Sequence, residues 1–269
     1  MAPRAAEAAD AIQYLPGCET NVLEAGDDNA SGTGGVNVYD PGAPPAVAQP
    51  IGFTLNFFGA GESQLYVNNN GNISFGSAQG AYTPDGLSSP GHPAIIAPFW
   101  ADVDTRSQTL AATPSPTSTT PPPDENVTYG PTTFDGHLAY CVLWHNVGYF
   151  NQETDKLNDF QLLIVDRPDQ GTSANGDDFD FFFNYNQVQW ETGDYSGGTD
   201  GLGGSCAEIG YTNGSGDSGT WAQDPNPEAC SVLLDSDPAG LTSTSLNTSI
   251  LGSRLFQARS GTVVALPTL

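Results

Sequence analysis

The most constraining feature of the sequence is a series of short segments in which apolar and polar residues alternate with a period of two. The first segment places Ile51, Phe53, Leu55 and Phe57 on one side, with Gly, Thr and Asn residues between them. Successive side chains of a strand point to opposite faces of a sheet, so this alternation is typical of a strand that buries one face. Similar segments recur along the chain, and they predict an all-β fold of roughly ten strands.

The other predicted strands share this alternation or consist of a short apolar run. They fall at residues 64–67, 73–75, 94–103, 138–144, 160–165, 179–190, 207–211, 231–234 and 254–258. Pro98 interrupts one of them, so we expect an edge position or a bulge there. The apolar phase shifts by one residue after Tyr185, which predicts a β-bulge near Asn186. The turn residues of 68–71, three Asn and one Gly, predict a tight hairpin.

The chain is long enough to bury a large core, and β-sandwiches of 269 residues fold as one domain. We predict a flexible N-terminal arm at residues 1–17 and a single β-sandwich-like domain at 18–269, with its packed core at about 50–260 and long surface loops. Residues 107–124 are rich in Thr, Pro and Ser and cannot build a core. We interpret them as a loop within the domain, and a domain boundary there is the alternative.

The charge balance is strongly acidic, with 31 Asp and Glu against 6 Lys and Arg and a formal net charge of −25. Nucleic acid is excluded as a partner because phosphate binding depends on Lys and Arg. Anionic lipid surfaces would repel such a chain. The composition allows divalent cations, a cationic partner or a high-salt environment, and its ordinary interpretation is a solvated acidic surface.

No run of 18 apolar residues occurs, so we predict no membrane span. The first dozen residues lack the apolar stretch of a signal peptide, and we infer a leader that has been removed. Export is instead suggested by the cysteines. Their number is even and no two have CxxC spacing, which favours disulfides in an oxidising compartment over a metal cluster. We predict a Cys206–Cys230 pair that closes a short loop, and less firmly Cys18–Cys141.

Five Asn-x-Ser/Thr sequons are compatible with glycosylation in a eukaryotic source. They begin at Asn29, Asn72, Asn126, Asn213 and Asn247. In a chain this rich in Asn, Ser and Thr, several also arise by chance.

Catalytic motifs give little support to an enzyme. Residues 216–219 read GDSG, the tetrapeptide around the nucleophile of trypsin-like proteases, yet a serine needs a neighbouring general base. His92, His137 and His145 lack the sequence context of such a base, and we interpret 216–219 as a polar turn. Three scattered histidines do not suggest zinc either.

Pairs of carboxylates are a further candidate chemistry. Asp102 and Asp104, like Asp178 and Asp180, are two residues apart and share a face if they lie on strands. Such pairs serve glycoside hydrolysis, but calcium is the use that we favour for Asp102 and Asp104, because Ca²⁺ takes oxygen ligands from Asp-rich loops. Asn158, Asp159 and Glu191 are distant possible additions. For the cluster of Asp102, Asp104 and Arg106 we prefer the ordinary interpretation, a mutual ion pair or turn cap, and a cation or partner site is the functional alternative.

Residues 27–32 resemble the first half of an EF-hand loop, with Asp27, Asn29, Ser31 and Gly32 at the expected spacing. The twelfth position holds Val38 instead of a bidentate Glu, so we do not predict an EF-hand. No other cofactor is expected.

Several longer phrases, taken together, resemble the nidogen-like (NIDO) domain family. They are FTLNFFG (53–59), LYVNNNGNISF (65–75), IIAPFWADVDTR (95–106), WHNVGYF (144–150), DKLNDFQ (155–161), FNYNQVQWETG (183–193) and SLNTS (245–249), followed by Phe256. Their order and spacing cover about residues 50–260. Trp100, Trp144 and Trp190 lie within these phrases, and we expect them in the core.

The resemblance implies an extracellular, non-catalytic module of cell–matrix adhesion or of matrix or surface assembly, with a matrix or cell-surface protein or a glycan as partner. It carries over no catalytic residue and names no partner. The alternatives are a secreted carbohydrate-binding module, a hydrolase that uses acidic residues, and a self-assembling fibre or surface-layer subunit. The extreme acidity, the 107–124 loop and the cysteines at 206 and 230 depart from the family pattern.

Overall fold

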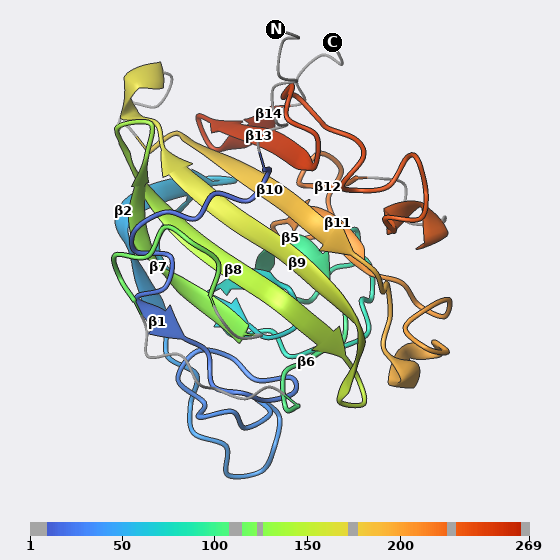
Figure 1. Ribbon diagram of the computed structural model, residues 1–269. Helices are drawn as coiled ribbons and strands as arrows, with labels where there is room; N and C mark the ends of the chain where they lie inside the picture. Colours follow the sequence, from blue (N-terminus) through green and yellow to red (C-terminus); the bar gives the residue numbers. More distant parts are fainter. Residues whose placement is uncertain (1–9, 108–114, 123–125, 172–176, 225–229, 265–269) are drawn as a thin grey trace, which may run out of the picture.

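The protein folds into two antiparallel sheets that face each other, as the alternating pattern predicts (Figure 1). The computed structural model describes residues 10–107, 115–122, 126–171, 177–224 and 230–264. Within these ranges the helical elements are three short 3₁₀ turns, η1 (Pro168–Gln170), η2 (Asp194–Ser196) and η3 (Cys230–Leu233). The all-β, sandwich-like fold class is therefore confirmed. No helix of the described ranges is long and apolar enough to cross a bilayer.

The larger sheet runs in the order β1-β7-β8-β9-β10-β13-β14, and β6 pairs with β8 beside this path. Its strands are β1 (Asn21–Val22), β6 (Val103–Asp104), β7 (Asn126–Phe134), β8 (His137–Tyr149), β9 (Glu153–Asp166), β10 (Phe179–Val188), β13 (Ser253–Arg259) and β14 (Thr262–Val264). The three longest strands, β8, β9 and β10, lie side by side and form the middle of this sheet.

The smaller sheet runs in the order β12-β11-β5-β4-β3-β2. Its strands are β2 (Gln49–Phe57), β3 (Ala60–Asn68), β4 (Asn72–Phe75), β5 (Ala94–Trp100), β11 (Glu208–Thr212) and β12 (Trp221–Gln223). Pro98 lies in the middle of this sheet, opposite a register shift between Glu208 and Gly210. The bulge predicted at Pro98 is confirmed and the edge position is not.

The predicted bulge near Asn186 is also confirmed, because the pairing of β10 with β9 shifts between Tyr185 and Gln187. One strand prediction is wrong: residues 231–234 lie in and after η3, whose four residues are too few to show a periodicity. The sequence pattern missed β7, whose alternation is interrupted by Gly130 and Pro131. It also missed the short strands β1, β12 and β14.

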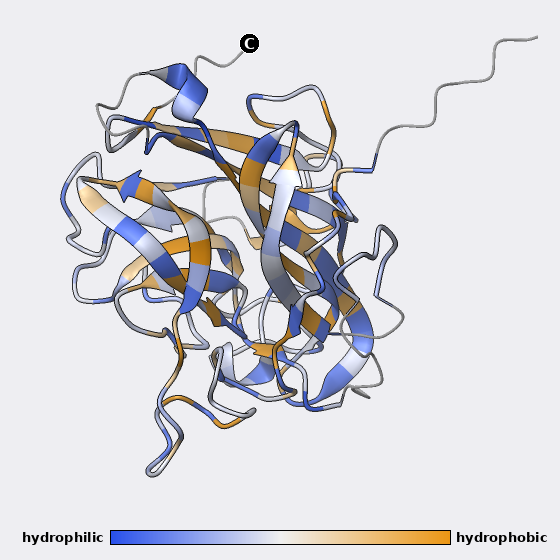
Figure 2. Cartoon of the chain, turned by 90° about the vertical axis from the view of Figure 1, so that its left-hand side faces the viewer, coloured by the Kyte–Doolittle hydropathy of each residue, from blue (hydrophilic) through white to orange (hydrophobic). Residues whose placement is uncertain are grey.

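The core lies between the sheets and is rich in stacked aromatic rings. Phe181 and Phe256 stack with ring centroids 4.9 Å apart, and Trp144 stacks on Phe160 at 5.1 Å. Phe99 of the smaller sheet contacts Phe160 of the larger one, at 5.4 Å, so aromatic contacts join the two layers. Figure 2 shows hydrophobic residues along the strands and mostly hydrophilic ones in the loops. The three Trp residues expected in the core are fully buried.

The N-terminal segment packs against the larger sheet from about residue 10 onward. Ala11 and Ile12 are buried, and the Gln13 N–H donates to Gln161 Oε1 at 3.0 Å. Residues 10–17 of the expected arm therefore lie against the sheet, whereas residues 1–9 are outside the described ranges. The structure pairs Cys18 with Cys141 of β8, and Cys206 with Cys230. Of the Thr/Pro-rich segment 107–124, residues 107 and 115–122 are described, and they form no helix or strand.

Candidate functional site

One end of the sandwich is closed by polar residues. We call it the polar end and define it as residues 23–47, the hairpin turn 68–71 and residues 101–106. Residues 23–47 form a long loop beside β6 (Figure 1). The hairpin turn holds this loop, since Asn69 Nδ2 donates to the Gly26 carbonyl at 3.2 Å and Asn70 Nδ2 donates to Asp28 Oδ1 at 2.7 Å.

The hairpin turn also fixes the chain that leaves β5. Gly71 has φ +71°, and a Cβ there would lie 1.8 Å from the Phe99 carbonyl oxygen, so only glycine fits. The close approach lets the Phe99 N–H donate to the Gly71 carbonyl at 3.1 Å and the Ala101 N–H to the Asn70 carbonyl at 3.3 Å. The sequence NNNG, predicted as a plain hairpin turn, is therefore a buried connector that sets the position of Asp102.

Three carboxylates meet beside this connector. Among the described residues, oxygen atoms of Asp27, Asp28 and Asp102 lie within 4.8 Å of one another and form a group suited to a metal ion. They line a pocket of about 290 Å³, and the aromatic residues that also line it are Tyr82, Phe150 and Tyr195. We call the three aspartates with their cavity the acidic pocket, and the three aromatic residues its aromatic rim.

The carboxylates of the acidic pocket differ in their hydrogen bonds. Asp28 is well bonded, because its two oxygens accept from Asn70 and Asn37 at 2.7 and 2.8 Å. Asp102 is only 2% exposed, and its Oδ2 is buried without a hydrogen-bond partner. Asp27 Oδ1 is also buried and has no partner. A buried carboxylate oxygen without a donor is costly, so these two oxygens require a ligand or a proton.

Burial and mutual repulsion change the acidity of the group. Burial raises the pKa of Asp102 to about 8, and the nearby charges of Asp27 and Asp28 add to the shift. Burial likewise raises the pKa of Asp27 to about 7 and that of Asp28 to about 6, while the Arg106 guanidinium acts in the opposite direction on both. Without a cation, the pocket therefore holds protons at a pH where ordinary aspartates are ionised.

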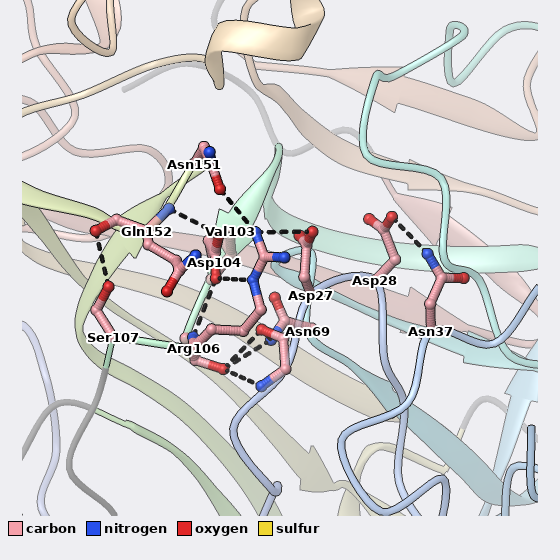
Figure 3. Close-up of polar contacts among 12 residues, drawn as sticks. Asp27, Asp28, Asn37, Asn69, Val103, Asp104, Arg106, Ser107, Asn151 and Gln152 are labelled. Carbon is pink, nitrogen blue, oxygen red and sulfur yellow. Dashed lines mark hydrogen bonds and ion pairs between the residues drawn. The ribbon is translucent and has the colours of Figure 1, made fainter. Parts of the chain in front are cut away.

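Asp104 lies beside the acidic pocket and is paired with Arg106 (Figure 3). Arg106 Nε donates to Asp104 Oδ1 at 2.9 Å, and its Nη2 reaches Asp27 Oδ2 at 3.2 Å. The Gln152 N–H donates to Asp104 Oδ2 at 2.8 Å. The ion pair expected between Asp104 and Arg106 is thus present, and Asp102 is joined by Asp27 and Asp28 instead.

The remaining predicted ligands lie elsewhere. Asp159 accepts from His145 Nδ1 at 2.9 Å, Asn158 Nδ2 donates to the Trp190 carbonyl, and Glu191 Oε1 accepts the Gly203 N–H. Of the half EF-hand, Asp27 lies in the acidic pocket, whereas Ser31 Oγ donates to the Val47 carbonyl at 2.8 Å and Asn29 Nδ2 donates to the Glu24 carbonyl. Asp28 and the aromatic rim were missed, because their positions 28, 82, 150 and 195 show no common spacing in the sequence.

The sequons divide by burial. The side chains of Asn29, Asn72 and Asn126 are at most 1% exposed, so a glycan on them is incompatible with this packing. Asn213 and Asn247 are half-buried and stay predictions.

The serine of the GDSG segment lies in an exposed turn, as interpreted from the sequence. The Thr220 N–H donates to the Asp217 carbonyl at 3.2 Å and closes this turn. In the described ranges no histidine forms a hydrogen bond with Ser218. His92 interacts with the Pro93 carbonyl, His145 with Asp159, and His137 approaches Asp169 at 3.9 Å.

Both members of the second acid pair, Asp178 and Asp180, are bound by neighbouring groups of the protein. Asp180 binds both Arg167 and Arg259, and Asp178 Oδ1 accepts the Ser260 N–H at 2.8 Å. These carboxylates join β10 to its neighbours and serve the fold.

The fold and the site define a class of protein: a disulfide-bonded antiparallel β-sandwich with an acidic, aromatic-rimmed pocket at one end. The family model described as "Nidogen-like domain" matches residues 63–258, which is more than half of the chain. The chain therefore belongs to the nidogen-like domain family, as the phrases in the sequence predict. Asp102 and all three residues of the aromatic rim lie inside the matched region, whereas Asp27 and Asp28 precede it.

Curated relatives support the same assignment. The chain is 32% identical to alpha-tectorin of Mus musculus over 166 residues, which cover 59% of this chain and 7% of that protein. It is 28% identical to nidogen of Drosophila melanogaster over 163 residues, which cover 56% of this chain and 12% of nidogen. The chain thus spans a small part of the relatives that it matches. No solved structure matches it at a significant level.

Proposed function

We propose that this chain is a non-catalytic extracellular module that binds a matrix or cell-surface protein in adhesion or in matrix assembly. The observation that carries the proposal is the nidogen-like match over residues 63–258, since this domain occurs in the extracellular matrix proteins nidogen and alpha-tectorin. Two disulfides support an oxidising, extracellular location.

The acidic pocket and its aromatic rim offer a contact surface for such a partner. Tyr195 is 71% exposed, and its ring lies 5.6 Å from that of Tyr82 and 5.8 Å from that of Phe150. Exposed Tyr residues are enriched at the centres of protein interfaces because they bring large apolar area and a polar tip. Together with the net charge of −25, this surface favours a partner with a basic face.

Two features weigh against the alternative functions. The paired carboxylates Asp104 and Asp180 are bound to arginines, which leaves them poorly suited to acid–base catalysis. The outer strands β1, β12 and β14 have two or three residues each, and the longer outer strand β2 contains Pro50 and a register shift. Short or irregular edges disfavour assembly by strand pairing between copies.

The experiment uses the full chain, immobilised, against a panel of purified matrix proteins and a glycan array. Tyr195→Ala is compared with Leu251→Ala, which removes an exposed apolar side chain that does not line the acidic pocket. We expect binding to a basic matrix protein that Tyr195→Ala weakens by about 10-fold or more and Leu251→Ala leaves unchanged. Added salt weakens the same binding.

Three outcomes would contradict the proposal. Binding confined to glycans and lost in Tyr195→Ala would make the chain a carbohydrate-binding module. Hydrolysis of a polysaccharide that stops in Asp102→Asn or Asp104→Asn would make it a hydrolase. Polymers that form with rising protein concentration, seen by electron microscopy, would make it a fibre or surface-layer subunit.

A further inference from the structure

We propose that the acidic pocket is a calcium site that ties the N-terminal loop to the end of the sandwich. Asp27 and Asp28 come from the loop of residues 23–47, and Asp102 comes from the link between β5 and β6. A single ion bound by all three would connect segments that are more than 70 residues apart in the sequence. The proposal does not depend on which partner the module binds.

Besides the cluster of acids, Asp102 has a buried oxygen without a hydrogen-bond partner. Asp102 lines the pocket and is only 2% exposed, and its Oδ2 is buried without a hydrogen-bond partner. Gly193 permits this position, because a Cβ there would lie 2.5 Å from Asp102 Oδ2. The Asp102 carboxylate therefore lies close to Gly193, and its Oδ2 has no protein donor. Such an oxygen is suited to bind a metal ion.

The local charge favours a further cation when the carboxylates are ionised. Asp27, Asp28, Asp102 and Asp104 contribute four negative charges when ionised, and Arg106 contributes one positive charge, which leaves −3. Arg106 is held by Asp104 and reaches only Asp27 among the three carboxylates of the pocket within ion-pair distance. A divalent ion would reduce the remainder to −1 and supply a partner to Asp102 Oδ2 and Asp27 Oδ1 together.

Calcium fits the donors and the space. All three donors are carboxylate oxygens, and Ca²⁺ takes six to eight oxygens at about 2.3–2.6 Å with irregular geometry. Oxygens on opposite sides of such an ion are therefore up to about 5 Å apart, and the three carboxylates lie within 4.8 Å of one another. The pocket volume of about 290 Å³ leaves room for bound waters to complete the coordination.

The test is calorimetric titration of CaCl₂ into the EDTA-treated and dialysed full chain, at an ionic strength held constant with NaCl. We expect one site with a Kd of about 0.1–1 mM or tighter, the range of extracellular calcium modules. Thermal melts with 10 mM CaCl₂ should show a higher Tm than melts with EDTA, because the ion binds only the folded state.

Variants distinguish this site from the acidic surface at large. Asp102→Asn should weaken calcium binding at least 10-fold, and it should leave the Tm in EDTA equal or higher because the cost of ionising a buried carboxylate is removed. Asp217→Asn makes the same charge change on an exposed turn and should bind calcium like the wild type. If Asp102→Asn does not fold by circular dichroism, Asp27→Asn, whose Oδ1 also lacks a partner, decides by the same criterion.

Three results would overturn the proposal. They are the absence of binding heat and of a Tm change in the wild type at 10 mM calcium, unchanged calcium affinity in the deciding variant, and a site that binds butylammonium but not calcium. The last result would assign the acidic pocket to a lysine side chain of a partner.

Discussion

The middle of the sandwich and its polar end are both buried, but their interactions differ in kind. In the middle, Phe181 and Phe256 stack between the sheets, and the surrounding side chains are apolar. At the polar end, Asn69 and Asn70 are fully buried and are held by directional hydrogen bonds to the 23–47 loop and to residues 103 and 105. Apolar packing stabilises without regard to direction, whereas each buried polar atom needs its own partner.

This difference shows where a ligand is needed. In the middle of the sandwich the aromatic rings pack against one another, so these side chains need no ligand. The polar end has carboxylate oxygens on Asp27 and Asp102 that no protein donor satisfies. A proton or a cation would stabilise these two carboxylate oxygens, whereas the rings in the middle of the sandwich need neither.

The largest expected effect is in the middle of the sandwich. Phe181→Ala removes a fully buried ring that contacts Phe179, Phe183, Tyr211 and Phe256, and should lower the free energy of unfolding by about 3–5 kcal/mol. Leu251→Ala, at a side chain that is 58% exposed, should change it by less than about 0.5 kcal/mol. Denaturant unfolding measures both, and similar values for the two variants would refute the proposed core.

A smaller loss of stability is expected when the connector of the polar end, residues 68–71, is changed. Asn70→Ala removes the donor to Asp28 Oδ1 and the acceptor of the Val103 N–H, which are 2.7 and 3.1 Å away. The free energy of unfolding in EDTA should fall by about 1–3 kcal/mol, since buried groups lose their hydrogen-bond partners. Asn213→Ala, in a turn near the surface, serves as the control. If Asn70→Ala left the free energy of unfolding unchanged, the connector would not hold the 23–47 loop.

A third effect is a dependence of stability on pH in the presence of EDTA. The pKa values of Asp27, Asp28 and Asp102 are raised from 3.8 to about 7, 6 and 8 in the folded chain. Between pH 4 and pH 8 the folded state therefore binds more protons than the unfolded state, and the contribution of these groups to stability falls as the pH rises.

Melts of the wild type and of Asp102→Asn at a series of pH values measure this dependence. The fall in Tm between pH 4 and pH 8 should be shallower in Asp102→Asn, because one titrating group is gone. A wild-type Tm that rises through this range, or equal slopes in the two proteins, would contradict the buried, ion-free carboxylates.

Most of the sandwich could be predicted from the sequence because its strands bury one face and leave a two-residue period. The bulge near Asn186 followed from the same period, as the apolar phase changes there. The pattern failed where the period is too short or interrupted: η3 has four residues, and β7 contains Gly130 and Pro131.

The acidic pocket was predicted only in part, for a physical reason. Asp102 could be proposed as a candidate ligand because it follows a buried apolar run. The residues that join it come from distant parts of the chain. Asp27 and Asp28 meet Asp102 because the turn at 68–71 binds both the loop and the end of β5. The proximity of the three aspartates depends on tertiary hydrogen bonds, and a periodic pattern in the sequence cannot predict it. The same holds for Tyr195, whose neighbours Tyr82 and Phe150 precede it by 113 and 45 residues.

The most direct measurement of the central claim, that the polar end depends on a cation and the middle of the sandwich does not, is amide hydrogen exchange followed by mass spectrometry, with EDTA and with 10 mM calcium. We expect calcium to slow exchange in peptides from residues 23–47 and 101–106, to leave β9 and β10 unchanged, and to have no such effect in Asp102→Asn. Equal exchange of the 23–47 loop in both conditions, or an equal change in β9 and β10, would contradict it.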